Sequence, residues 1–155
     1  MKRVFDISFS LIGIIIFFPI IFIFCFLIWL QDFGNPLYVS KRIGKNFVEF
    51  NLIKLRSMIL NADKSGVEST SNNDQRITRI GSLVRKYKLD ELMQLYNVLL
   101  GDMSLVGPRP NVKTETNLYT KEEKKLLNVK PGITDFASIV FSDEGNILKD
   151  KADPD

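Results

Sequence analysis

Residues 7–31 read ISFSLIGIIIFFPIIFIFCFLIWLQ, and this uncharged stretch decides the fold. A helix rises 1.5 Å per residue, so a helix of this length would measure about 37 Å, enough to cross the hydrocarbon core of a bilayer. A cleaved signal peptide fits less well, because the apolar stretch is too long and no small-residue cleavage site follows it. The start of the chain is therefore predicted to be a membrane segment.

The charges on the two flanks of this segment favour a re-entrant helix over a simple span. Lys2 and Arg3 precede it, and five basic residues follow it between Lys41 and Arg56. Basic flanks tend to stay in the cytoplasm, and a single span cannot keep both there. Pro19 lies near the middle, where its ring and its missing N–H should bend or break the helix. We expect a re-entrant hairpin, with a spanning helix as the alternative because prolines also occur in spanning helices.

The composition excludes several classes of chemistry. The chain has no histidine and one cysteine, Cys25, which excludes serine–histidine–aspartate triads, cysteine–histidine pairs, the usual zinc clusters and an internal disulfide. Cys25 lies inside the apolar run and is interpreted as an apolar filler. The net charge of +3 is concentrated around the membrane segment, which suits an anionic lipid surface, and no arginine-rich helix indicates nucleic-acid binding. Catalysis would have to use carboxylates, lysine, arginine, hydroxyls or a hard cation.

The rest of the chain predicts a small α+β domain. Residues 37–40 and 47–54 are β-prone and predict a hairpin, whereas residues 61–75 are polar and predict a mobile loop near the active face. We therefore divide the chain into a re-entrant membrane hairpin at residues 1–31 and a cytoplasmic-face catalytic domain at residues 32–155.

Three helices are predicted within this domain. Residues 78–87 have an amphipathic pattern that suits the membrane interface or the core. A second helix should begin near Asp90 and end at Gly101, because glycine is the common residue after a helix. Thr120 and Glu123 have the spacing of a capping box that opens a short third helix.

Asp90 and Glu91 are the first candidates for chemistry. A structural interpretation is strong, because Asp is a favoured N-cap and Glu is favoured in the first turn of a helix. The same position keeps a carboxylate ionised beside a bound anion, which suits a nucleophile that attacks phosphorus or a magnesium ligand. The pattern alone leaves both readings open.

Arg109 is the second candidate, because it stands between Pro108 and Pro110. The two prolines restrict the backbone, so that the guanidinium needs little ordering before it makes a bidentate contact with phosphate. The alternative is a rigid loop in which the arginine makes a structural ion pair.

Six ordered motifs make a family resemblance specific. With a proline-interrupted apolar helix after Lys2-Arg3-Val4-Phe5-Asp6, the chain resembles the bacterial sugar transferase family of small monotopic phosphoglycosyl transferases over nearly its whole length. The motifs are KLRSM at 54–58, RITRIG at 76–81, LDEL at 89–92, QLYNVL at 94–99, GDMSLVGPRP at 101–110 and PGIT at 131–134.

The resemblance implies a two-step transfer of a sugar phosphate. Asp90 would attack the β-phosphate of a UDP-sugar and release UMP, and polyprenyl (undecaprenyl) phosphate would then take the phosphosugar from the enzyme. Asp90 and Glu91 would hold Mg²⁺, and Arg109 would hold a phosphate. Lys54, Arg56 and Arg79 are weaker candidates for the same anionic pocket.

The resemblance also implies a place in the cell. It places the chain at the cytoplasmic face of a bacterial inner membrane, with lipid as a partner, no nucleic acid, and a dimer among the open oligomeric states.

The chain departs from the family pattern at three places. Phe18 precedes the proline where Ser is usual, and Met93 stands where Pro is frequent. Relatives also continue beyond Asp155, so the chain looks truncated. A non-catalytic membrane scaffold and a one-step metal-dependent transferase remain the alternatives, and the sugar and the glycan pathway are not specified.

Overall fold

The computed structural model describes residues 1–62 and 74–135 and confirms the α+β class. Residues 63–73 and 136–155 lie outside the description, and with them most of the predicted loop at 61–75. The described helices and strands are α1 (Lys2–Asp32), β1 (Leu37–Ile43), η1 (Lys45–Phe47), β2 (Glu49–Leu55), α2 (Arg79–Lys86), η3 (Leu89–Met93), α3 (Gln94–Leu100), β3 (Ser104–Val106), α4 (Lys113–Asn117), η4 (Glu123–Asn128) and β4 (Gly132–Thr134).

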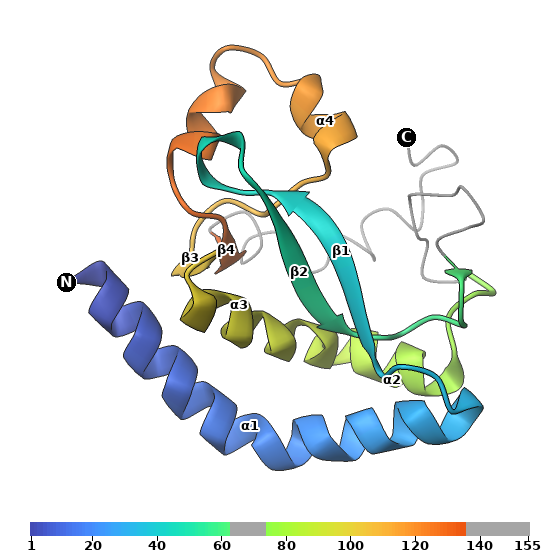
Figure 1. The fold of residues 1–155 in the computed structure, drawn as a ribbon. Helices are drawn as coiled ribbons and strands as arrows, with labels where there is room; N and C mark the ends of the chain where they lie inside the picture. The colour runs from blue at the N-terminus through green and yellow to red at the C-terminus, as the bar shows by residue number, and fades with distance from the viewer. Residues whose placement is uncertain (63–73, 136–155) are drawn as a thin grey trace.

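Helix α1 is the predicted membrane segment, and it stays helical through Pro19. Figure 1 shows that it changes direction near its middle, so the proline bends the helix and does not split it into two separate half-helices. Only 6% of its most apolar stretch is buried, and within the described residues it is the one helix long and apolar enough to cross a membrane. Its exposed apolar surface is compatible with a membrane anchor.

Both ends of α1 are tied to the rest of the protein. Near the first end, the buried Asp6 carboxylate accepts hydrogen bonds from Ser104 Oγ and from the Leu105 backbone N–H. At the other end, Asp32 makes a bidentate pair with Arg56, whose two guanidinium nitrogens lie 2.7 and 2.6 Å from its oxygens. The intervening residues bow away from the domain, and α2 and α3 lie along the concave side of the bend (Figure 1).

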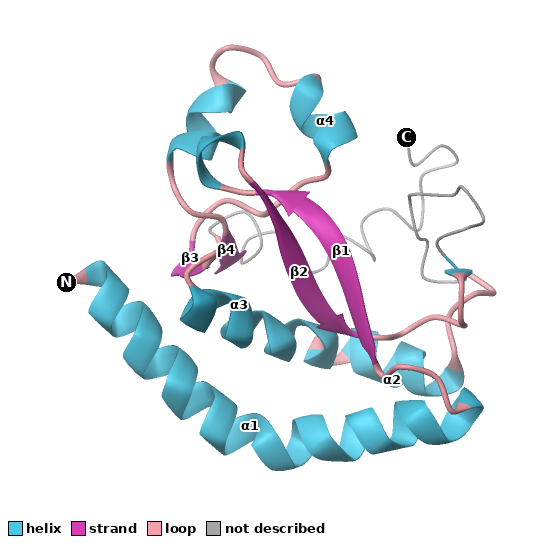
Figure 2. Ribbon diagram, viewed as in Figure 1, coloured by secondary structure: helices cyan, strands magenta, loops and turns pink. Residues whose placement is uncertain are grey.

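Strands β1 and β2 form the predicted antiparallel hairpin. Figure 2 shows the hairpin extending from the α2 and α3 side of the molecule toward α4. The side chain of Asn97 hydrogen-bonds two backbone groups on the free edge of β2. It accepts from the Ile53 N–H at 3.0 Å and donates to the Asn51 carbonyl at 2.7 Å. Asn97 is fully buried, so this amide takes the place of a neighbouring strand.

The segment from α2 to α3 begins as predicted and then differs. Thr78 caps α2, with its hydroxyl accepting from the Gly81 N–H at 2.9 Å. The expected N-cap role of Asp90 is wrong, because Lys88 occupies the cap position of a 3₁₀ turn in the left-handed conformation, with φ 52°. The α-helix itself begins only at Gln94. Gly101 ends it in the left-handed conformation, as predicted.

The short parallel pair of β3 and β4 brings two distant motifs together. Gly107 and Gly132 make the close approach possible, because a Cβ on Gly132 would lie 2.1 Å from the Gly107 backbone nitrogen. The predicted capping box is also present, with the Thr120 N–H donating to Glu123 at 2.8 Å and the Glu123 N–H donating to Thr120 Oγ at 3.3 Å. It precedes a 3₁₀ helix, η4.

Candidate active site

Asp90 and Glu91 lie on η3, next to strand β2 of the hairpin. Lys54 on β2 places its Nζ 3.8 Å from Asp90 Oδ2 and 3.4 Å from Glu91 Oε1. Arg109 approaches from the other side and donates from a guanidinium nitrogen to Glu91 Oε1 at 2.9 Å. Two of the predicted basic residues, Lys54 and Arg109, therefore converge on the predicted carboxylate pair. The side chains of Asp90 and Glu91 are only 15% and 16% exposed.

The two carboxylates have opposite pKa shifts. Burial raises the pKa of Asp90, and the adjacent Glu91 charge adds to this, while Lys54 and Arg85 act in the opposite direction. Burial also raises the pKa of Glu91, but the positive charges of Lys54 and Arg109 and their hydrogen bonds outweigh burial, so that its pKa is lowered overall. Lys54 and Arg109 thus stabilise the charged form of Glu91. The charged form of Asp90 is stabilised less, because nearby positive charge does not fully offset its burial.

The Arg109 loop is fixed by β4. The Gly132 N–H donates to the Pro108 carbonyl at 2.9 Å, and the Gly107 N–H donates to the Thr134 carbonyl at 3.0 Å. The Arg109 side chain itself is 57% exposed. A rigid backbone therefore presents an accessible guanidinium beside Glu91.

Two further predicted residues lie elsewhere. The Arg56 side chain is 7% exposed and is bound to Asp32 and to the Ile28 carbonyl, so its described contacts hold the end of α1. Arg79 is exposed on α2, and within the described parts of the chain no hydrogen bond or ion pair joins it to the carboxylate pair. The structure does not bring Arg56 and Arg79 together with Lys54 and Arg109.

Sequence reasoning missed Arg42 and Gln94, which line a small polar hollow with Lys54 and Arg109. The β1–β2 register pairs Arg42 with Phe50, which places Arg42 and Lys54 on the same face of the hairpin. Gln94 is 3% exposed, so it forms part of the packed base of this hollow. The alternation of Phe50, Leu52 and Lys54 indicated this face, but the register of Arg42 required the structure.

Arg85 is a third residue that the sequence did not single out. Its guanidinium Nε donates to Ser57 Oγ at 2.8 Å. Burial lowers the pKa of Arg85, and the charge of Asp90 partly restores it. Arg85 therefore adds positive charge to the surroundings of Asp90.

Magnesium fits the oxygen donors of Asp90 and Glu91. In the described parts of the chain, no group of three or more histidine, cysteine or acidic side chains converges to hold a metal. Magnesium is commonly held by one or two carboxylates together with water and substrate phosphates. The pair could therefore hold the ion with water and substrate phosphate oxygens completing its coordination.

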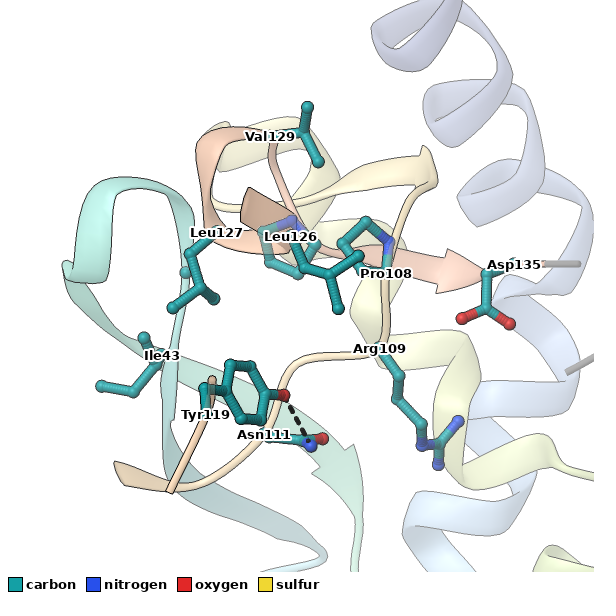
Figure 3. Close-up of a pocket in the computed structure, with 11 residues that line it drawn as sticks. Ile43, Pro108, Arg109, Asn111, Tyr119, Leu126, Leu127, Val129 and Asp135 are labelled. Carbon is teal, nitrogen blue, oxygen red and sulfur yellow. Dashed lines mark hydrogen bonds between the residues drawn. The ribbon is translucent and has the colours of Figure 1, made fainter. Parts of the chain in front are cut away.

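A larger cavity of about 360 Å³ opens on the other side of the Arg109 loop. Apolar side chains, including Pro108 and Leu127, form much of its wall, and Asn111 and Tyr119 face it (Figure 3). The Asn111 amide nitrogen donates to the Tyr119 hydroxyl at 3.0 Å. The loop that carries Arg109 thus separates an apolar cavity from the polar hollow at the carboxylate pair.

The sequence comparisons place this site in a known family. The model of the family described as bacterial sugar transferase matches residues 1–155. The chain belongs to this family. Membership makes it a sugar transferase and confirms the resemblance that the ordered motifs indicated.

Curated relatives agree with this membership. A Bacillus subtilis (strain 168) protein named "Putative undecaprenyl-phosphate N-acetylgalactosaminyl 1-phosphate transferase" is 47% identical over 133 residues, covering 86% of this chain and 70% of that protein. The UDP-N-acetylgalactosamine-undecaprenyl-phosphate N-acetylgalactosaminephosphotransferase of Aeromonas hydrophila is 37% identical, covering 90% of this chain and 34% of its own length. The undecaprenyl-phosphate galactose phosphotransferase of Salmonella typhimurium (strain LT2) is 38% identical, covering 86% of this chain and 31% of its own length. The chain thus spans about a third of the last two relatives.

Proposed function

We propose that this sugar transferase moves a sugar 1-phosphate from a UDP-sugar to polyprenyl (undecaprenyl) phosphate, as the first membrane step of surface glycan synthesis. The observation that carries the proposal is the Asp90 carboxylate, whose burial is only partly offset by nearby positive charge, beside Glu91, Lys54 and Arg109. The relatives' names supply the acceptor, undecaprenyl phosphate, and one of them names UDP-N-acetylgalactosamine as the donor.

The first step uses Asp90 as a nucleophile. A carboxylate oxygen of Asp90 attacks the β-phosphorus, the bond from that phosphorus to the bridging oxygen breaks, and UMP leaves with the bridging oxygen and its electron pair. The product is an aspartyl phosphosugar. The raised pKa of Asp90 supports this role, because a less stabilised carboxylate is the more nucleophilic of the pair.

In the second step, an oxygen of polyprenyl phosphate attacks the same phosphorus. The aspartyl–phosphorus bond breaks, the carboxylate is restored, and the polyprenyl diphosphosugar is the product. Arg109, Lys54 and Arg42 line the hollow where the transferring phosphates would lie, and their charges are suited to the negative charge that builds up there. Magnesium bound at Asp90 and Glu91 would offset part of the diphosphate charge.

The two anchored ends of α1 support a re-entrant arrangement in the membrane. Ser104 and Arg56 hold opposite ends of the bent helix to one domain. We propose that α1 is re-entrant, so that both ends lie at the cytoplasmic face of the inner membrane. The carboxylate pair would then stand near the headgroups, where the acceptor phosphate lies while its polyprenyl tail stays in lipid.

The reaction is tested by measuring UMP release from UDP-sugars with Mg²⁺ and undecaprenyl phosphate. The relatives' names divide between N-acetylgalactosamine and galactose, so both donors belong in the panel. Incubation with donor but without acceptor should leave phosphosugar on Asp90, detectable as a mass increase of its peptide. Full turnover with no trapped adduct would favour a one-step transfer in which the carboxylates only bind metal. Failure to release UMP from any UDP-sugar would favour a non-catalytic scaffold.

A further inference from the structure

The cavity beside Arg109 has the size and lining of a site for a flat heterocycle with an attached sugar. Its volume is about 360 Å³, within the range of small-ligand pockets, which are mostly apolar with a few placed polar groups. Ile43 and Leu127 are 4% and 8% exposed, so this part of the wall belongs to the packed interior. Such a wall suits the face of an aromatic base.

The polar part of the cavity retains unused hydrogen-bonding capacity. The Asn111 amide donates to the Tyr119 hydroxyl, so that its own carbonyl oxygen remains an acceptor. That oxygen has no partner among the described residues, and neither does the proton of the Tyr119 hydroxyl. Asn111 and Tyr119 therefore offer one acceptor and one donor side by side (Figure 3).

This pattern is complementary to the pairing edge of uracil. Uracil presents an N3–H donor between two carbonyl acceptors, so the Asn111 oxygen can accept from N3–H while the Tyr119 hydroxyl donates to an adjacent carbonyl. Cytosine held in the same orientation presents an unprotonated N3 at this place, which would face the Asn111 oxygen without a shared proton. It could pair with both groups only by shifting until its N4 amine faced that oxygen.

The placement of the phosphate-binding residues gives the direction of the bound nucleotide. Arg109 lines both the cavity and the polar hollow that contains Arg42, Lys54 and Gln94. A nucleoside diphosphate laid across the Arg109 loop would put its base in the cavity and its phosphates in the hollow. The β-phosphate would then lie toward Asp90.

Resting on the proposed function, we propose that this cavity binds the uracil and ribose of the donor, and that Asn111 and Tyr119 determine its selectivity for uridine nucleotides. Neither residue contacts the carboxylate pair in the structure. They select the donor and take no part in the chemical steps.

The test measures nucleotide affinity by competition against labelled UDP, using the full chain in lipid nanodiscs. We expect UDP to compete at least about tenfold better than CDP, because a site built to pair with a polar edge rejects an edge that leaves its groups unpaired. Tyr119→Phe and Asn111→Leu should each reduce that ratio several-fold, whereas inorganic pyrophosphate should compete equally well in every variant. Lys113→Gln is the control, because the Lys113 side chain is 70% exposed and its ammonium pairs with Glu49 on the neighbouring hairpin.

Each result has a defined meaning. Equal competition by UDP and CDP in the wild type, or an unchanged ratio in both variants, overturns the assignment of the cavity. A selective wild type whose selectivity falls in either variant, with pyrophosphate binding intact, supports it. The proposed reaction is judged separately: selective UDP binding without UMP release would sink the reaction and leave the cavity assignment standing, whereas turnover with an unchanged ratio in the variants would sink the cavity assignment alone.

Discussion

The Asp6 carboxylate in the first turns of α1 lies 2.9 and 3.1 Å from Ser104 Oγ, although 98 residues separate the two in the chain. Asp6 is 6% exposed and Ser104 is 1% exposed, so water does not compete for this contact. Ser104 begins β3, which leads through Gly107 to Arg109. Helix α1 is thus bonded to the strand that positions the Arg109 loop.

Asp6→Ala should therefore destabilise the protein. The substitution leaves the buried Ser104 hydroxyl and the part-buried Leu105 N–H without their acceptor, and an unsatisfied buried group costs about 1–3 kcal/mol. A thermal melt of the purified protein in detergent should show a clearly lower midpoint. Asp6→Asn is the matched variant, because its amide oxygen keeps one acceptor and should retain part of the stability. Equal midpoints for wild type and Asp6→Ala would show that this contact is unimportant.

Asp90→Asn should abolish turnover without lowering stability. An amide cannot form the aspartyl phosphosugar, so the loss of activity should be complete. Because burial raises the pKa of Asp90 in the folded protein, its charged form costs folding free energy at neutral pH, and the neutral amide removes that cost. The midpoint of the melt at pH 7 should be equal to or above that of the wild type. Substantial retained turnover would remove Asp90 from the nucleophile role.

The pH profile of kcat/KM should show the ionisation of Asp90, and the pH at which this occurs should depend on the charge of Lys54. The nucleophile must be ionised, so activity should be lost as the pH falls through the raised pKa of Asp90. The positive charge of Lys54 lowers that pKa, and Lys54→Met should therefore shift the acid limb to higher pH, apart from any loss in maximal rate. Lys113→Gln should leave the limb in place. An acid limb that does not move in Lys54→Met would contradict control of Asp90 by Lys54.

The sequence predicted the parts of the fold that depend on local pattern. The apolar helix, the hairpin, the Thr120–Glu123 capping box and the Gly101 helix end all follow from short-range spacing and are present. Asp90 as an N-cap failed, because the left-handed turn at Lys88 starts a 3₁₀ segment first. No pattern around Lys88 distinguishes that conformation from an ordinary helical start.

The residues of the candidate site likewise fall into those that linear motifs predicted and those that depend on tertiary packing. Lys54, Asp90, Glu91 and Arg109 belong to motifs and converge in the structure. Arg56 was placed with them by its motif, yet it is bonded to Asp32, and that pairing depends on how the end of α1 packs. Arg42 and Gln94 were missed because their position depends on strand register and on burial, neither of which a linear motif contains.

Arg109→Lys should lower activity although it keeps the charge. A lysine cannot reproduce the planar fork of the guanidinium, and the contact with Glu91 at 2.9 Å uses one of its donors while others stay free for phosphate. Losing a hydrogen bond to a charged group is worth about 1.5–3 kcal/mol, which corresponds to a loss of about tenfold or more in kcat/KM. Arg79→Lys is the matched control, because Arg79 is exposed on α2 away from this pair. Wild-type kinetics in Arg109→Lys would exclude a phosphate clamp.

The bend at Pro19 should decide whether both ends of α1 lie on one side of the membrane. In a Cys25→Ser background, Lys2→Cys and Lys41→Cys place single thiols before and after the helix, and both positions are exposed in the structure. If α1 is re-entrant, both thiols should resist a membrane-impermeant reagent in intact cells and react after lysis. Labelling of residue 2 from outside in nearly all molecules would instead establish a spanning helix.

Pro19→Leu, measured by the same labelling experiment, tests whether the proline bend keeps residue 2 at the cytoplasmic face. Leucine restores the missing N–H and removes the ring clash, so that the helix can straighten, and a helix of this length can span a bilayer. Straightening must also break the contacts of Asp6 with Ser104 and Leu105, which hold the first turns to the domain. Pro19→Leu alone should therefore expose residue 2 to the outside in part of the population, and adding Asp6→Ala should increase that fraction. An equal fraction in the single and double variants would show that these hydrogen bonds do not hold the first end of α1 at the cytoplasmic face.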